Sequence, residues 1–66
     1  MTIVVNGQPR QVAEGTTVAQ LVAALKLDDR ALAVEVNLQL VPRAKHVEHR
    51  LAEGDRLEIV TLVGGG

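Results

Sequence analysis

The chain contains no Phe, Tyr, Trp or Cys among its 66 residues, and this restricts what it can fold into. A domain of this length buries only about 60% of the surface of its unfolded chain, so its core must be packed efficiently. Without aromatic rings or disulfides, that core must be built from aliphatic side chains, and hydrophobic residues make up 47% of the sequence. We therefore expect one small domain with an aliphatic core.

The same composition argues against several kinds of function. Bases cannot stack on aromatic side chains, and a formal net charge of −1 gives no basic excess for phosphates. Thiolate nucleophiles and cysteine metal ligands are also excluded. No apolar run is long enough for a membrane span, and the first residues do not resemble a signal peptide. We expect a cytoplasmic protein, monomeric in isolation, that binds neither nucleic acid nor membrane.

The first half of the chain predicts a hairpin followed by a helix. Apolar residues 2–5 lead into Asn6-Gly7, a strong signal for a two-residue turn, and the returning strand carries Pro9, which suits a sheet edge. Thr17 and Gln20 form a capping box that opens a helix expected to end near residue 26. The apolar stripe of this helix has the spacing i, i+3, i+4, i+7 and consists of Val18, Leu21, Val22 and Leu25.

The second half predicts three further strands. Residues 31–36 alternate between apolar and polar, residues 38–41 form a short strand stopped by a proline, and residues 56–63 form the last strand. Between them, residues 43–50 are polar and irregular, with Leu51 as their expected core anchor. The order predicts an α+β fold of the β-grasp type, a mixed sheet of four to five strands packed on one main helix. Residues 1–63 would form the domain and residues 64–66 a flexible C-terminal tail.

The glycine tail and the strand before it predict a binding function. Glycine is costly to order, so Gly64, Gly65 and Gly66 indicate a side-chain-free arm carrying a carboxylate, unless they are only a frayed end. Alternation along the last strand points Leu57 and Ile59 inward. The residues that it exposes, together with their neighbour, form the expected partner contact: Val60, Leu62 and Val63. The alternative for Val60 is half-burial against a neighbouring strand.

Several short motifs in order resemble the ThiS family of ubiquitin-like sulfur carrier proteins in thiamin (thiazole) biosynthesis. The resemblance covers the whole chain through residues 5–7, 15–18, 34–37, 41–43, 54–55 and 60–66. It departs from the family at Leu62, where many relatives carry Phe, and this affects only the packing against partners. The resemblance implies that the expected β-grasp fold is of the ubiquitin-like form.

The resemblance implies a carrier and not an enzyme. A ThiF-like adenylyltransferase would consume ATP to adenylate the Gly66 carboxylate, and a cysteine desulfurase or other donor would supply sulfur. The resulting thiocarboxylate would give its sulfur to a ThiG-like thiazole synthase. The carrier itself would hold no cofactor. Two alternatives stay open: a carrier of another pathway, namely a molybdopterin synthase small subunit or a ubiquitin-related modifier, and a β-grasp interaction module with an incidental tail.

Other polar residues have simpler interpretations. His46 and His49 have the spacing of metal ligands on a helix but lack further ligands, so we expect no metal site and two solvated histidines. Asp28-Asp29 indicates a polar loop. The basic cluster of Arg43, Lys45 and Arg50 is either a solvated loop or a contact with an acidic partner surface.

Overall fold

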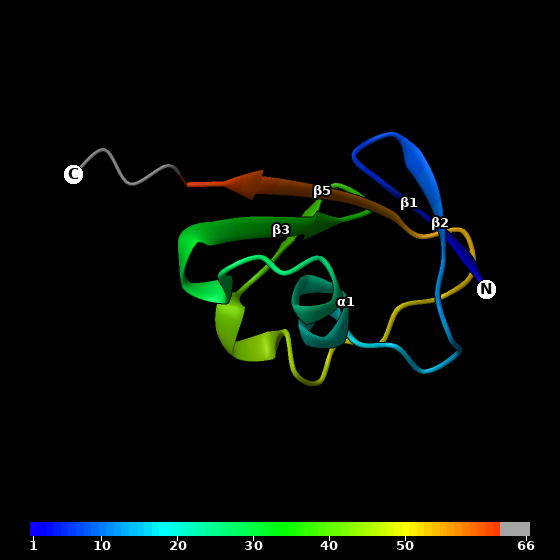
Figure 1. Ribbon diagram of the computed structural model, residues 1–66, viewed down its shortest axis with the longest axis horizontal. Helices are drawn as coiled ribbons and strands as arrows, with labels where there is room; N and C mark the ends of the chain where they lie inside the picture. Colours follow the sequence, from blue (N-terminus) through cyan, green and yellow to red (C-terminus); the bar gives the residue numbers. More distant parts are fainter. Residues whose placement is uncertain (63–66) are drawn as a thin grey trace.

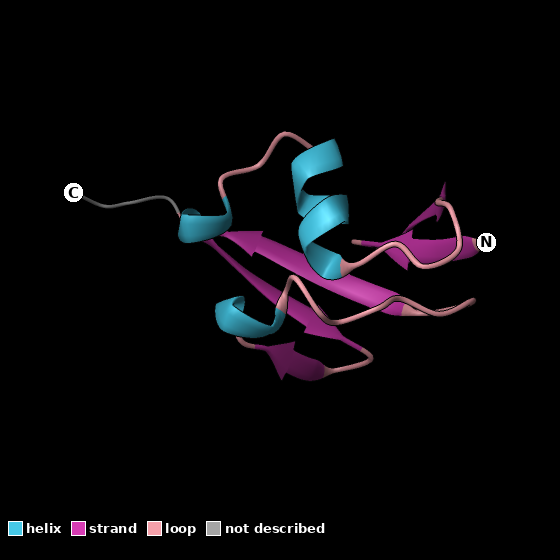
Figure 2. Ribbon diagram, turned by 90° about the horizontal axis from the view of Figure 1, so that it is seen from below, coloured by secondary structure: helices cyan, strands magenta, loops and turns pink. Residues whose placement is uncertain are grey.

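The computed structural model describes residues 1–62 and shows a five-stranded mixed sheet with one α-helix across one face (Figures 1 and 2). The strand order is β2-β1-β5-β3-β4. The elements are β1 Thr2–Val5, β2 Gln8–Gln11, α1 Val18–Ala24, η1 Asp29–Ala31, β3 Leu32–Val36, β4 Gln39–Val41, η2 Arg43–Lys45 and β5 Arg56–Thr61, where η marks a short 3-10 helix.

The predicted hairpin is confirmed. β1 and β2 pair antiparallel, and both turn residues have positive φ, 50° at Asn6 and 81° at Gly7, as a two-residue hairpin turn requires. β2 is an edge strand, with Pro9 opposite Val4. The proline therefore sits where a missing N–H costs no interior ladder bond.

The capping box is also confirmed, and the helix is shorter than expected at its end. The Thr17 hydroxyl accepts from the Gln20 N–H, and the Gln20 side chain accepts from the Thr17 N–H. The helix ends at Ala24 because Lys26 adopts a left-handed φ of 59°. The Lys26 N–H donates to the Ala23 carbonyl, and the Leu27 N–H donates to the Val22 carbonyl. This is the hydrogen-bond pattern of a Schellman motif.

β5 joins the two halves of the chain. It pairs parallel with β1 and antiparallel with β3, so the first and last strands lie side by side in the middle of the sheet. This mixed sheet packed on a single helix confirms the β-grasp architecture. The helix covers the inward face, and the opposite face of the sheet is exposed.

The core is aliphatic and lies between α1 and the inward face of the sheet. Leu51 anchors the long connection between β4 and β5, since only 5% of its surface is exposed. Leu25 packs against the core and is only partly buried. The buried apolar residues are Ile3, Val18, Leu21, Val22, Leu32, Val34, Val36, Val41, Leu51, Leu57 and Ile59. No helix within residues 1–62 has the length and apolar character needed to cross a membrane.

The prediction that both histidines are solvated is wrong for His46. Only 1% of its surface is exposed, because both ring nitrogens have partners inside the fold. Nε2 lies 3.0 Å from the Val41 carbonyl oxygen, and Nδ1 lies 2.6 Å from Asp29 Oδ1. His46 thereby ties η1 and β4 to the segment after η2, whereas His49 is half-buried.

The β3–β4 turn carries an unusual residue. Asn37 and Leu38 both have positive φ, 52° and 70°, and Leu38 is 88% exposed. The second position of such a turn favours glycine, because a bulky side chain is strained there. The position of Leu38 therefore strains its backbone and leaves its side chain exposed.

Candidate partner-binding site

The exposed apolar residues at the end of β5 form the candidate site. Val60 is 57% exposed and Leu62 is 55% exposed, while Leu57 and Ile59 on the opposite face are buried. The alternation expected from the sequence is therefore confirmed. Val60 is more exposed than the alternative of half-burial against a neighbouring strand predicts. Val63 and Gly64–Gly66, the remaining predicted site residues, lie outside the described residues.

The surroundings of this pair are apolar on one side and acidic on the other. Ala33 of β3 lies opposite Val60, so the apolar surface continues across the two strands. One step back, Glu35 lies directly opposite Glu58, and like charges in such pairs are unfavourable. Within residues 1–62, neither carboxylate forms an ion pair. The exposed face thus offers a nonpolar end and an uncompensated negative centre.

The Asn6 side chain holds β5 in place just before Val60. β1 ends at Val5, but Asn6 Oδ1 accepts from the Ile59 N–H at 2.8 Å and Nδ2 donates to the Ile59 carbonyl at 3.1 Å. One side chain therefore replaces the backbone groups of a missing strand residue. It satisfies a donor and an acceptor that would otherwise have no partner in the sheet.

Asn37 makes the equivalent contact at the start of β5. Its Oδ1 accepts from the Arg56 N–H at 3.0 Å, its Nδ2 donates to Asp55 Oδ1 at 3.0 Å, and its own N–H donates to the Arg56 carbonyl. The sequence reveals both asparagines as turn residues and does not reveal these roles. Asn is common in turns because it tolerates positive φ, but this preference does not indicate which distant residue its side chain will bond.

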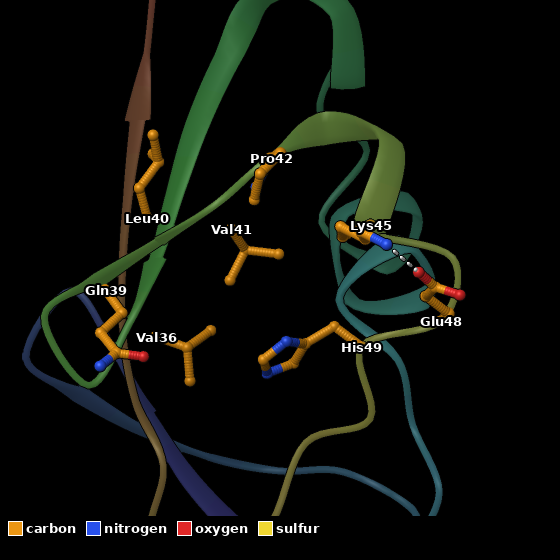
Figure 3. A pocket seen from close by; sticks show the side chains of 8 residues that line it. All are labelled: Val36, Gln39, Leu40, Val41, Pro42, Lys45, Glu48 and His49. Atoms are coloured by element: carbon orange, nitrogen blue, oxygen red, sulfur yellow. Dashed lines mark ion pairs between the residues drawn. The ribbon is translucent and has the colours of Figure 1, made fainter.

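A pocket of about 340 Å³ lies beside β4 and is a weaker candidate. Figure 3 shows its lining side chains, with the His49 ring directed towards Val36 and Val41 and an ion pair between Lys45 and Glu48 on one wall. The floor of the pocket is aliphatic, and the charges of Lys45 and Glu48 neutralise each other. Apart from that ion pair, the polar side chains of the lining are Gln39 and His49, so few polar groups are present to orient a small molecule.

The basic cluster of the sequence is partly neutralised by carboxylates of η1 and of its own segment. Arg43 Nε lies 3.8 Å from Asp29 Oδ2, and Lys45 pairs with Glu48 at 3.1 Å. The Asp28-Asp29 segment is a polar loop, as predicted, in which Asp28 caps η1. Hydrogen bonds from the Arg30 side chain and backbone hold the pKa of Asp28 below its ordinary value of 3.8. Within residues 1–62, no three His, Asp or Glu side chains are gathered in a group that could hold a metal ion.

Comparison with known proteins identifies the family. A model of the ThiS family matches residues 3–66. The chain belongs to the ThiS family. The resemblance drawn from its motifs is therefore confirmed over nearly the whole sequence.

Relatives of the same length and fold support this ThiS assignment. The sulfur carrier protein ThiS of Escherichia coli is 33% identical over 66 residues, covering all of both chains. The crystal structure of a ThiS from Geobacter metallireducens superposes with a TM-score of 0.85 at 33% identity, again over all of both chains. A thiazole synthase of Paramagnetospirillum magneticum is 41% identical over 66 residues, and here the chain spans only 20% of the relative. A ThiS-like sequence therefore also occurs within longer thiazole synthases.

Proposed function

We propose that the protein is a sulfur carrier in the biosynthesis of the thiamin thiazole. The observation that carries this proposal is the position of β5. This strand is fixed on both sides by the sheet and the two asparagines, and it leads directly into Gly64–Gly66 past an exposed apolar pair. Sulfur carriers of the same family have the same length and fold.

The proposed chemistry takes place at the Gly66 carboxylate. Such a group has an ordinary pKa of about 3.5 and is ionised at neutral pH, so it can attack a phosphorus atom of ATP held by a partner. Pyrophosphate leaves and an acyl adenylate forms. A persulfide sulfur of the donor then attacks the carbonyl carbon, and AMP leaves with one of the original oxygens. A thiol cleaves the resulting acyl disulfide, which releases the thiocarboxylate and leaves a disulfide on the donor.

The carrier contributes reach and recognition to this chemistry. Glycines at positions 64 and 65 have no side chains to block entry into a narrow catalytic cleft. Val60 and Leu62, with Val63 next to them, form the contact that docks the partner. The ATP site and the sulfur donor belong to partner enzymes, so the protein is a protein cosubstrate and not an enzyme.

Three partners follow from the proposal: a ThiF-like adenylyltransferase, a sulfur donor such as a cysteine desulfurase, and a ThiG-like thiazole synthase. ThiS-like sequences within thiazole synthases support the last of these, because fusion places a carrier next to the enzyme that consumes its sulfur. We propose that the encounters occur in the cytoplasm.

Intact mass spectrometry tests this function directly. The protein is co-expressed with a thiazole-pathway adenylyltransferase and a cysteine desulfurase, alongside a variant lacking Gly66. We expect a mass gain equal to one oxygen replaced by sulfur in the wild type and no gain in the variant. Loss of the gain while the same enzymes load a known carrier would refute the proposal for that pathway.

The rival functions give different results in the same system. A molybdopterin-type carrier would be loaded only by the activating enzyme of that pathway. An interaction module with an incidental tail would keep its binding after deletion of Gly65 and Gly66, whereas a carrier would lose its function.

A further inference from the structure

β5 is a central strand along its first half and an edge strand along its second. Figures 1 and 2 show the β1–β2 hairpin beside only the first part of β5, whereas β3 runs along its whole length. The register agrees, since β1 pairs with Arg56 and Leu57 and β3 pairs with every residue from Leu57 to Thr61. The end of β5 nearest the tail therefore has a strand on one side only.

Alternation of the backbone decides which groups face the open side. The carbonyls of Asp55 and Leu57 accept from β1 and the following turn, and Ile59 bonds Asn6 on that side. Arg56 and Leu62 bond the other way, to Asn37 just after β3 and to Ala31 just before it. The next odd residue, Thr61, therefore directs its N–H and C=O to the side where β1 has ended.

Within residues 1–62, neither a strand pairing nor a hydrogen bond joins Thr61 to another residue on the side of β1. The side chain itself is exposed, and exposed Val60 and Leu62 flank it on the outward face. Unpaired N–H and C=O groups at a sheet edge are a template for another strand. Edges of this kind are commonly managed by charges or prolines, and residues 60–62 contain neither.

We propose that this open edge receives an extended segment of the adenylating partner, which adds a strand to the sheet beside Thr61. The proposal rests on the carrier function proposed above. Four residues lead from Leu62 to Gly66, so the reacting carboxylate lies at most about 14 Å from Leu62 even when fully extended. An enzyme that reacts with Gly66 must therefore cover the end of β5.

Strand addition explains how such a partner can recognise the tail through its backbone. Main-chain hydrogen bonds to Thr61 would fix the direction of the residues that follow, while Val60 and Leu62 fill side-chain sites on the partner. In this arrangement the backbone hydrogen bonds align the tail, and the two apolar side chains supply affinity for the partner.

A matched set of variants tests the open edge. Thr61→Pro removes the N–H that faces the open side and leaves the bonds to β3 in place. Thr61→Val keeps that N–H and changes only the side chain. Gln11→Pro is the control for proline at an edge: Val12 exchanges hydrogen bonds with Met1, so the N–H of Gln11 faces away from β1.

We expect Thr61→Pro to bind the adenylyltransferase about tenfold or more weakly, because one bond is lost and a partner carbonyl stays unpaired. Binding by Thr61→Val and Gln11→Pro should stay close to wild type, and far-UV circular dichroism should show all three folded. Amide exchange by NMR adds a direct readout: the Thr61 N–H should exchange fast in the free protein and slowly in the complex.

Equal binding of Thr61→Pro and Thr61→Val, or unchanged exchange at Thr61 on complex formation, would overturn the proposal even if loading of Gly66 proceeds. Protection of Thr61 in the isolated protein together with dimerisation would assign the edge to a second copy and also overturn it. Failure of the wild type to bind and load refutes the carrier function itself, so the two failures are distinguishable.

Discussion

Replacement of Asn6 by glycine should weaken the fold at the point where β5 leaves its parallel neighbour. Asn6→Gly keeps the positive φ of 50° at no strain and removes only the side chain that bonds the Ile59 N–H and carbonyl. Both bonds are partly buried and lie within the sheet. Each contributes about 0.5–1.5 kcal/mol, so we expect the free energy of unfolding to fall by about 2 kcal/mol.

Asn37→Gly is the matched control, since Asn37 also opens a two-residue turn with positive φ. Its side-chain bonds to Arg56 and Asp55 are exposed to water, so the loss should be smaller, about 1 kcal/mol. Urea unfolding should be followed by far-UV circular dichroism, because the chain has no Trp or Tyr whose fluorescence could report.

The losses of stability in the two variants should follow a fixed order as well as these magnitudes. If Asn6→Gly lay within about 0.5 kcal/mol of wild type, or lost no more than Asn37→Gly, the Asn6 side chain would not be the element that stabilises β5. The two variants should also differ in function, because Asn6 lies next to the partner-binding end. Loading of Gly66 in the mass assay should slow more in Asn6→Gly than in Asn37→Gly.

Three further predictions concern other parts of the fold. His46→Ala should lower the free energy of unfolding by about 3 kcal/mol, since it removes two hydrogen bonds and leaves a cavity, whereas half-buried His49→Ala should cost under about 1 kcal/mol in the same urea experiment. Leu38→Gly should stabilise the protein by about 0.5–1 kcal/mol, because it relieves a left-handed leucine that is 88% exposed; a loss of stability would contradict this. Arg30 lowers the pKa of Asp28, so that pair contributes stability above pH 3.8 that is lost as the pH falls through the lower folded pKa. An NMR titration should place the Asp28 midpoint below 3.8, and Arg30→Ala should raise this midpoint.

Local patterns predicted most of the architecture. The turn at Asn6-Gly7, the capping box at Thr17 and the alternation along the last strand are decided by interactions within a few residues of each other, so the sequence displays them. The exposed positions of Val60 and Leu62 follow from the same alternation and were correct.

Long-range polar contacts could not be predicted in the same way. His46 lies in a polar, irregular segment, and its burial depends on a carboxylate 17 residues earlier in the sequence. Asn6 reaches Ile59 across 53 residues. A single sequence carries no periodic signal for such pairs, because each side chain acts alone and its partner is supplied only by the folded sheet.

The central position of β5 has a consequence for how the protein is made. Within residues 1–62, β1 and β3 do not pair with each other, and β5 bridges them although it is the last of the described strands. On a ribosome, the hairpin, the helix and β3–β4 would all emerge before the strand that unites them, and pairing of β1 with β5 must close a loop of more than 50 residues. The polypeptide therefore completes its sheet only when the strand that leads to Gly66 has been synthesised, so a prematurely terminated chain would be left unfolded and exposed to proteolysis.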